Sequence, residues 1–250
     1  MGKRMASKQP VIGIDVGGTN ITAGLVNEKN KIVARHKIDT EADQGEAHVI
    51  ERIASCVNEL LDDAKYKLAD IAGIGLGIPG AVDPAAGVVL EAVNLRWTDM
   101  PVAKQLAKQV DLPITLDNDV NVGAWGEYEI GAAKDAKGVL AIFVGTGIGG
   151  GIILNGELYT GVYGTAGEIG HMIVDTHGPL GSRTLERLAS RTSVVNRLHA
   201  LVNANVESNI KELSGSKWPR IRSKALRKAL AGDDPLTMRV LQDAARVIRK

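Results

Sequence analysis

The sequence predicts a two-lobed α/β protein, and three observations lead to this fold class. An apolar strand, a glycine turn and a returning strand occur twice, at residues 11–26 and 138–154, as a weak internal repeat. Apolar residues at helical spacing follow the first copy, at residues 46–63. At 250 residues, the chain is long enough for two modest hydrophobic cores. Two related lobes that face each other would account for all three features.

The first half of the chain alternates between strands and helices. Strands are expected at residues 11–15, 21–26 and 31–38, joined as an antiparallel meander. The amphipathic helix at 46–63 comes next, and the segment IAGIGLGIPG then predicts a buried strand that ends in a Pro-Gly turn. A short helix at residues 102–110 and a strand at 112–116 complete this half.

A lobe boundary is expected near residues 117–118, because it leaves one glycine hairpin on each side. Asp117 or Asn118 can cap the helix that follows, and Gly131 can end it. A strand at 138–144, the turn Gly145–Gly151 and a returning strand at 152–160 come next, and the chain is almost wholly helical from Leu185, with a polar interruption near Ser214–Pro219. The expected divisions are a flexible tail at 1–10, an N-terminal lobe at 11–117 and a C-terminal lobe at 118–250.

The composition excludes several classes of protein. Thirty basic and 29 acidic residues leave a formal charge of +1, so the chain has no excess positive charge to attract nucleic acid or an anionic membrane surface. The single cysteine, Cys56, cannot form an internal disulfide, and the basic start is followed by too short an apolar run for a signal peptide. We therefore expect a cytoplasmic protein whose ligands are small molecules.

Gly145-Thr-Gly-Ile-Gly-Gly has the form GxGxxG, but a strand-like segment follows it where a dinucleotide fold needs a helix. The alternative is a tight hairpin whose glycine N–H groups converge on phosphate oxygens. Asp15-Val-Gly-Gly-Thr-Asn predicts the same shape, with Asp15 and Thr19 at its mouth. Either turn alone would pass for an ordinary hairpin; the matching pair favours phosphate binding. A Mg²⁺ ion carried by nucleotide phosphates would offset the cost of burying the Asp15 carboxylate.

Five motifs occur in a characteristic order: GIDVGGTN, LGIPGAVD, LDNDVNVGAWGE, VGTGIGGG and GTAGEIGH. Together they resemble the ROK family (repressors, open reading frames and kinases), and within it the bacterial glucokinase branch. The resemblance runs from about Val11 to about Thr192. It implies the actin-like ATPase fold, which is ribonuclease H-like, with a central cleft between two lobes for nucleotide and sugar.

The resemblance also implies a role for each matching residue. Asp15 would hold Mg²⁺ through water, and Asp119 would be the general base that accepts the proton of the attacking sugar hydroxyl. On local context alone, Asp119 could equally be a first-turn carboxylate that favours the helix dipole. The remaining implied contacts are to phosphates for Gly17, Gly18, Thr19, Asn20, Gly145, Thr146 and Gly147, and to sugar for Gly80, Asn94, Asn118, Asp119, Glu168, His171 and Glu186.

The chain departs from the family pattern in two places. In the family, the histidine at position 171 joins three cysteines around a structural zinc, but here the shorter GSRT replaces the cysteine loop. His171 and His177 cannot supply four ligands, so no structural zinc is expected. The family also continues beyond the helix at 234–249 into a segment that contacts adenine. The C-terminal lobe is therefore expected to be either truncated or a variant with a reduced nucleotide site.

The leading functional hypothesis is an ATP-dependent hexose kinase, most simply a glucokinase that phosphorylates the 6-hydroxyl. The sequence leaves open mannose or N-acetylmannosamine as substrate, polyphosphate as donor, and a non-catalytic sugar-binding relative. The repressor branch of the family carries a helix-turn-helix ahead of the first strand, for which about ten residues leave no room. Related kinases pair as homodimers, and the same is expected here.

Overall fold

The computed structural model describes residues 9–162 and 164–249 and divides into two compact units. The first unit comprises the chain up to Leu140 together with Gly151–Ala166. The second comprises Ala141–Gly150 and the chain from Gly167 onward. The lobe boundary predicted near residues 117–118 stays a prediction, and the expected tail lies almost entirely outside the described residues.

A five-stranded sheet forms the centre of the first unit, in the order β3-β2-β1-β4-β8. The first three strands are antiparallel neighbours, which confirms the predicted meander, and β4 and β8 run parallel to β1. The carboxyl ends of β1, β4 and β8 therefore meet at one edge, which we call the carboxyl edge. The strands are β1 Val11–Val16, β2 Asn20–Val26, β3 Ile32–Asp39, β4 Ile74–Ile78 and β8 Ile114–Asn118.

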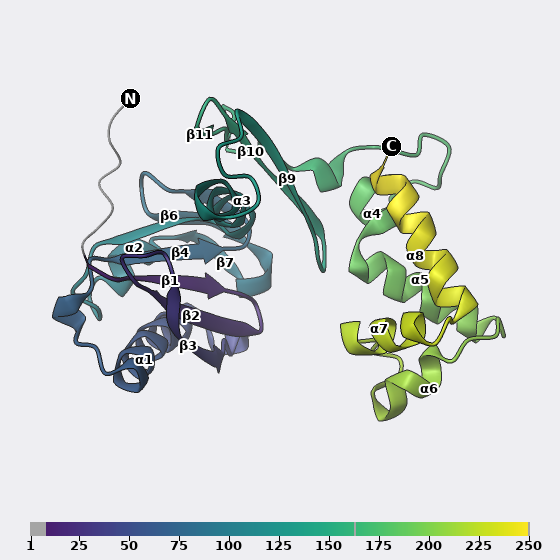
Figure 1. The fold of residues 1–250 in the computed structure, drawn as a ribbon, viewed down its shortest axis with the longest axis horizontal. Helices are drawn as coiled ribbons and strands as arrows, with labels where there is room; N and C mark the ends of the chain where they lie inside the picture. Colours follow the sequence, from purple (N-terminus) through teal and green to yellow (C-terminus); the bar gives the residue numbers. More distant parts are fainter. Residues whose placement is uncertain (1–8, 163, 250) are drawn as a thin grey trace. The chain divides into compact units, whose positions relative to one another are not determined.

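Helices cover both sides of this sheet, with α1 and α3 on opposite faces (Figure 1). The amphipathic pattern of α1 (Glu46–Ala64) buries one apolar stripe, including Ile53, Val57 and Leu60, among the alternating inward residues of β1 and β2. The helix α3 (Asp119–Ile130) begins directly after β8, as predicted, and is capped by the Asn118 side chain.

The helix α2 (Val102–Leu106) is shorter than the predicted helix at 102–110. After Leu106 the backbone hydrogen bonds tighten: the N–H of Lys108 donates to the carbonyl of Gln105, and that of Gln109 to the carbonyl of Leu106. Tight turns of this kind are common where a helix ends. Pro113 also disfavours a helical conformation in the residue before it, so the helix cannot extend as far as β8.

Two smaller three-stranded sheets complete the strand content. The sheet β5-β6-β7 was not expected from the sequence; its strands are only three to five residues long, and the buried Trp97 side chain anchors it to the first core. In the sheet β11-β10-β9, Gly149–Gly151 lie within a strand, so the prediction of a turn across Gly145–Gly151 was too long. The bounds are β5 Ala81–Asp83, β6 Val88–Ala92, β7 Trp97–Met100, β9 Gly138–Val144, β10 Ile148–Leu154 and β11 Glu157–Leu158.

Close packing explains why these glycines stay extended. A Cβ atom on Gly151 would collide with the Cβ atom of Ala124 in α3, and one on Gly150 would lie 2.8 Å from the carbonyl oxygen of Gly167. The glycines therefore let β10 pass close to its neighbours, rather than all forming one loop.

The second unit is mainly helical, as predicted from Leu185 onward, and has its own hydrophobic core around Leu198, Ile210 and Val240. The expected polar interruption separates α6 from α7. The helices are α4 Leu185–Ala189, α5 Arg191–Asn203, α6 Ile210–Ser214, α7 Ser223–Ala231 and α8 Pro235–Ile248, and short 3₁₀ turns occur at Ala42–Gln44, Leu68–Asp70, Val93–Leu95, Ile169–His171 and Gly215–Lys217.

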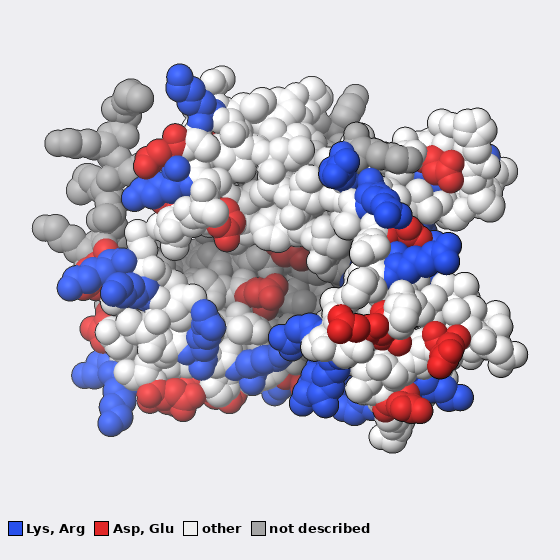
Figure 2. Space-filling view, turned by 45° about the vertical axis from the view of Figure 1, so that its right-hand side comes forward, with Lys and Arg blue, Asp and Glu red and all other residues white. Residues whose placement is uncertain are grey.

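Charged side chains of both signs are interspersed over the face shown in Figure 2, in agreement with the near-zero formal charge. Among the helices that the structure describes, none combines the length and apolar character that a membrane crossing would need.

Candidate functional site

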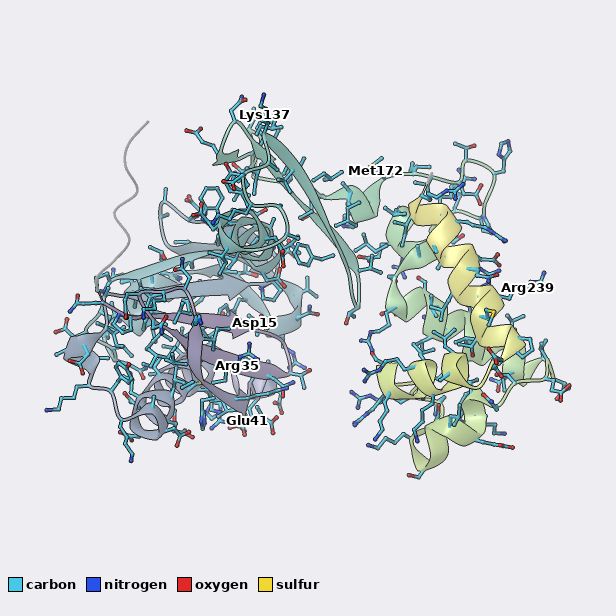
Figure 3. All side chains as sticks on the ribbon, viewed as in Figure 1. Asp15, Arg35, Glu41, Lys137, Met172 and Arg239 are labelled. Atoms are coloured by element: carbon cyan, nitrogen blue, oxygen red, sulfur yellow. The ribbon has the colours of Figure 1, made fainter. Side chains whose placement is uncertain are left out.

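Two carboxylates lie close to one another at the carboxyl edge of the central sheet. Asp15 is the fifth residue of β1 and pairs in register with Gly77 of β4, which in turn pairs with Asp117 of β8. Figure 3 labels Asp15 where β1 approaches its end. The pKa of Asp15 is raised by burial first and by the charge of Asp119 second, against a smaller lowering by Lys37. The two predicted carboxylates are therefore near enough to repel each other.

Asp119 combines a half-buried position with a partly unused carboxylate. Its Oδ1 atom accepts a hydrogen bond from the backbone N–H of Val120 at 2.9 Å. Burial raises the pKa of Asp119, and interactions with the backbone N–H groups of Val120 and of Asp119 itself oppose the shift. The Oδ2 atom has no hydrogen-bond donor among the residues that the structure describes. One oxygen is thus held by the helix and the other can accept a proton.

Asn118 is held by contacts on both ends of its amide. Its Oδ1 atom caps α3 by accepting from the N–H groups of Val120, at 2.9 Å, and Asn121, at 3.2 Å. Its Nδ2 atom donates to the carbonyl of Gly80 at 2.9 Å, so the structure brings these two predicted sugar-site residues together. Gly80 adopts φ 102°, and a Cβ atom there would collide with the carbonyl of Glu91. One N–H of the Asn118 amide remains for a ligand.

Asp117 supports this arrangement and was not among the predicted site residues. Its Oδ1 atom accepts from the backbone N–H of Asn118 at 2.6 Å and from the Nδ2 atom of the buried Asn121 side chain at 3.0 Å. Its place in the motif DND, at the end of a strand and before a helix cap, was the sequence feature that could have identified it as a site residue.

The first glycine turn, residues 17–19, is closed by a hydrogen bond from the Gly17 N–H to the Asn20 carbonyl at 2.9 Å. The N–H groups of Gly18 and Thr19 have no acceptor within the described parts of the chain. A Cβ atom on Gly18 would lie 2.9 Å from the carbonyl oxygen of Asn94, so only glycine lets the turn approach Asn94 so closely. The predicted phosphate turn and this predicted sugar-site residue are therefore neighbours.

Thr40 binds the same turn through two hydrogen bonds and was not among the predicted site residues. Its Oγ1 atom donates to the Gly17 carbonyl at 2.6 Å, and its backbone N–H donates to the Thr19 carbonyl at 3.0 Å. The side chain is fully buried. A threonine at the end of a predicted strand carries no distinguishing pattern, so the sequence offered nothing that would have singled it out.

The second glycine turn, residues 145–147, has the same construction. The Gly145 N–H donates to the Gly147 carbonyl at 2.9 Å, and the N–H groups of Thr146 and Gly147 find no acceptor in the described chain. The hydroxyl of Thr192 donates to the Thr146 carbonyl at 2.6 Å, as Thr40 does for the first turn. Two free N–H groups per turn suit phosphate oxygens.

Glu186 lies against this second turn. Its Oε2 atom accepts from the backbone N–H of Ile148 at 2.9 Å, and a Cβ atom on Gly147 would collide with the same oxygen. Its Cβ atom would in turn lie 3.4 Å from a Cβ atom on Gly170, in the 3₁₀ turn that carries His171. Glu186 thus connects the second glycine turn to the GEIGH segment.

Glu168 and His171 are exposed residues of the second unit. Their carboxylate and imidazole lie 3.8 Å apart, with side chains 58% and 74% exposed. Each retains free hydrogen-bonding capacity that a sugar hydroxyl could use.

Protein hydrogen bonds close the loop where the family carries its cysteines. The Oδ1 atom of Asp175 accepts from the N–H groups of His177 and Gly178, and the Arg183 Nε atom donates to the Gly178 carbonyl at 2.6 Å. No group of three or more metal-binding side chains occurs among the described residues.

Each unit, taken by itself, offers groups suited to nucleotide or metal. Asp15 and Asp119 supply carboxylate oxygens, the ligands that Mg²⁺ prefers directly or through water, and a cation beside them would relieve their mutual repulsion. The free N–H groups of the two glycine turns suit phosphate oxygens. The carboxyl edge of a partly parallel sheet is also where α/β proteins generally bind ligands.

Comparisons with known proteins agree with this geometry. The chain is 34% identical to a glucokinase from Halalkalibacterium halodurans, over 94% of this chain and 72% of that protein, and 28% identical to a xylose repressor from Caldicellulosiruptor bescii, over 83% of this chain and 54% of that one. A solved ROK family glucokinase from Streptomyces griseus, in complex with glucose and AMPPNP, superposes with a TM-score of 0.82 at 31% identity and covers 95% of this chain and 76% of that structure. The expected actin-like fold is thereby confirmed.

The family model for ROK proteins matches residues 11–248, which contain both glycine turns, the carboxyl edge and the helices of the second unit. The motifs, the fold and the site geometry lead to one conclusion: this chain belongs to the ROK family.

Proposed function

We propose that the protein is an ATP-dependent hexose kinase, with glucose as the first candidate substrate and its 6-hydroxyl as the acceptor. One observation carries the proposal: Asp119 has one carboxylate oxygen held by the Val120 N–H and the other free, beside Asp15 at the carboxyl edge. A phosphoryl acceptor needs a base in this position, and the donor needs a cation nearby. The glucokinase relatives support the same reaction.

In the proposed reaction, the sugar hydroxyl oxygen forms a bond to the γ-phosphorus of ATP while the bond to the oxygen of the ADP leaving group breaks. The hydroxyl proton passes to the Oδ2 atom of Asp119. The raised pKa of Asp119 makes its carboxylate a better proton acceptor than an ordinary aspartate. Asn118 fixes the start of α3, and therefore the Asp119 backbone, through its two cap hydrogen bonds.

The phosphates would be held by the free N–H groups of the two glycine turns, with Asp15 as the residue that holds Mg²⁺ through water. An ion held there would supply positive charge to neutralise what develops on the transferred phosphoryl group. The sugar contacts are assigned to Gly80, Asn94 and Asn118 in the first unit and to Glu168, His171 and Glu186 in the second. Asn118 has one amide N–H left and would act toward the sugar as a donor.

The test is formation of hexose phosphate from glucose, mannose and N-acetylmannosamine, with Mg-ATP as donor, where ADP is released, or with polyphosphate as a second donor. Phosphorylation of one hexose by ATP supports the proposal, and the panel identifies the sugar. Binding of sugar without formation of hexose phosphate from either donor would favour a sugar-sensing protein instead. That second function is worth testing because a xylose repressor is among the relatives.

Two further properties belong to the same proposal. A cytoplasmic location is expected for a kinase that uses free sugars and ATP, and a homodimer is expected because related kinases pair as homodimers. Sedimentation analysis of the purified protein checks the second.

A further inference from the structure

Arg191 is the first residue of α5 and touches the second glycine turn at two points. Its backbone N–H donates to the Gly145 carbonyl at 3.0 Å, and its Nη2 atom donates to the Thr146 hydroxyl at 3.1 Å. Its side chain is exposed. None of the residues implied by the family motifs occupies this position.

The charge of this arginine has no partner among the residues that the structure describes. No carboxylate in the described chain forms an ion pair with Arg191, and only one of its five guanidinium N–H groups is used, by Thr146. By contrast, Arg197 in the same helix pairs with Asp243 at 2.8 Å. The Arg191 guanidinium therefore presents a free charge and free donors beside the turn.

Holding the turn together does not require this arginine. The first glycine turn is fastened by Thr40, through its hydroxyl at 2.6 Å and its backbone N–H at 3.0 Å, and the second has the equivalent hydroxyl bond from Thr192, also at 2.6 Å. Arg191 adds a cation to a turn that is already fastened. A guanidinium adjacent to free backbone N–H groups is well matched to phosphate oxygens.

We infer that Arg191 is a phosphate-binding residue for the nucleotide, and that it favours nucleotides with more phosphate groups through its charge and free N–H donors. The inference rests on the proposed function, because it assigns the second glycine turn to the phosphates. It adds a residue that recognises the donor and takes no part in accepting the sugar proton.

The experiment compares Arg191→Met, Arg191→Lys and Thr192→Val with wild type, by calorimetric titration of the full chain with Mg-ATP, Mg-ADP, AMP and tripolyphosphate. Arg191→Met keeps the aliphatic stem and should weaken ATP and tripolyphosphate binding about ten- to a hundredfold, ADP binding less, and AMP binding hardly at all. Arg191→Lys should recover part of the loss. Arg227→Met removes one exposed charge of the same unit from α7 and is the control for net charge.

A purely structural role gives a different pattern. If Arg191 only braced the turn, Arg191→Met, Arg191→Lys and Thr192→Val would weaken all four ligands to the same extent, which would overturn the inference. If wild type bound ATP and Arg191→Met bound it equally well, the inference would also be overturned, but the proposed kinase function would not be. Wild-type protein that binds none of the phosphates would instead overturn the proposed function. Raised salt should weaken ATP binding more in wild type than in Arg191→Met.

Discussion

At the scale of single residues, the site depends on which oxygen and nitrogen atoms are already occupied by the protein. The Oδ1 atom of Asn118 accepts two hydrogen bonds in the cap of α3, whereas the Oδ2 atom of Asp119 accepts none from the described residues. Two adjacent polar side chains therefore have different tasks: one fixes the geometry, and the other is available for proton transfer.

Asp119→Asn should abolish most turnover and leave sugar binding intact. Asparagine keeps the acceptor for the Val120 N–H but cannot take up the hydroxyl proton, so kcat should fall about 10²- to 10⁴-fold. A coupled ADP assay and a sugar titration measure the two effects. Turnover close to that of wild type would remove Asp119 from its role as base.

The raised pKa values of Asp15 and Asp119 predict how stability depends on pH. Because each folded-state pKa lies above the ordinary value of 3.8, each group favours folding most below that value, and this contribution is lost as the pH rises through the folded-state pKa. Asp15→Asn and Asp119→Asn should therefore raise the free energy of unfolding at pH 7, and the gain should vanish near pH 3. Urea unfolding of the two variants and wild type between pH 3 and pH 7 measures this difference. A lower free energy of unfolding in the variants at pH 7 would contradict the prediction.

Gly147→Ala should displace Glu186, because the new methyl group would occupy the position of its Oε2 atom. The hydrogen bond to the Ile148 N–H would be lost, and overpacking of this kind costs about 1–3 kcal/mol of unfolding free energy. Gly145→Ala is the matched control, since a Cβ atom there meets nothing within 4 Å. Equal stability of the two variants in denaturant titrations would show that Glu186 is not held by this contact.

At the scale of elements, each glycine turn depends on a residue that follows it at a distance in the chain. Thr40 fastens the turn between β1 and β2, and Thr192 fastens the turn between β9 and β10. The internal repeat seen in the sequence thus extends to the way in which each hairpin is held, although neither threonine belongs to a recognisable motif.

Thr40→Val should loosen the first glycine turn. The buried valine leaves the Gly17 carbonyl without its donor, which costs about 1–3 kcal/mol, and the KM for ATP should rise. Thr40→Ser retains the hydroxyl and should keep the KM near the wild-type value. If Thr40→Ser raised the KM as much as Thr40→Val, the hydrogen bond would not account for the effect, because serine keeps the hydroxyl that donates to the Gly17 carbonyl.

At the scale of the whole molecule, the chain has two separate hydrophobic cores, one around the central sheet and one among the helices that follow Leu185. Separate cores let each unit open by itself. Unfolding is then expected to depart from a single two-state transition.

Leu60→Ala and Leu198→Ala test this independence, since both side chains are fully buried, one in each core. Each should cost about 2–5 kcal/mol in its own unit. By hydrogen exchange, Leu198→Ala should speed exchange in α5 and α8 and leave α1 protected, and Leu60→Ala should do the reverse. Faster exchange across both units in either variant would instead indicate one cooperative domain.

The sequence by itself determined the elements whose physical cause is local. The strands β1 and β2, the apolar stripe of α1 and a cap at one of the two residues 117 and 118 all formed as predicted, because periodicity and capping act between near neighbours in the chain. The family motifs also singled out Asp15, Asp119 and both glycine turns. The turn at 145–151 was drawn too long, because the collisions that Gly150 and Gly151 avoid involve residues elsewhere in the chain.

Only the tertiary structure decided which atoms of those residues remain free. Thr40, Thr192 and Arg191 reach the glycine turns from 23, 46 and 45 residues away along the chain, so no local pattern could connect them with phosphate binding. The repulsion between Asp15 and Asp119 likewise exists only because parallel strands bring their carboxyl ends to one edge. Hydrogen bonds and charges act through space, and the fold alone sets the distances across which they act.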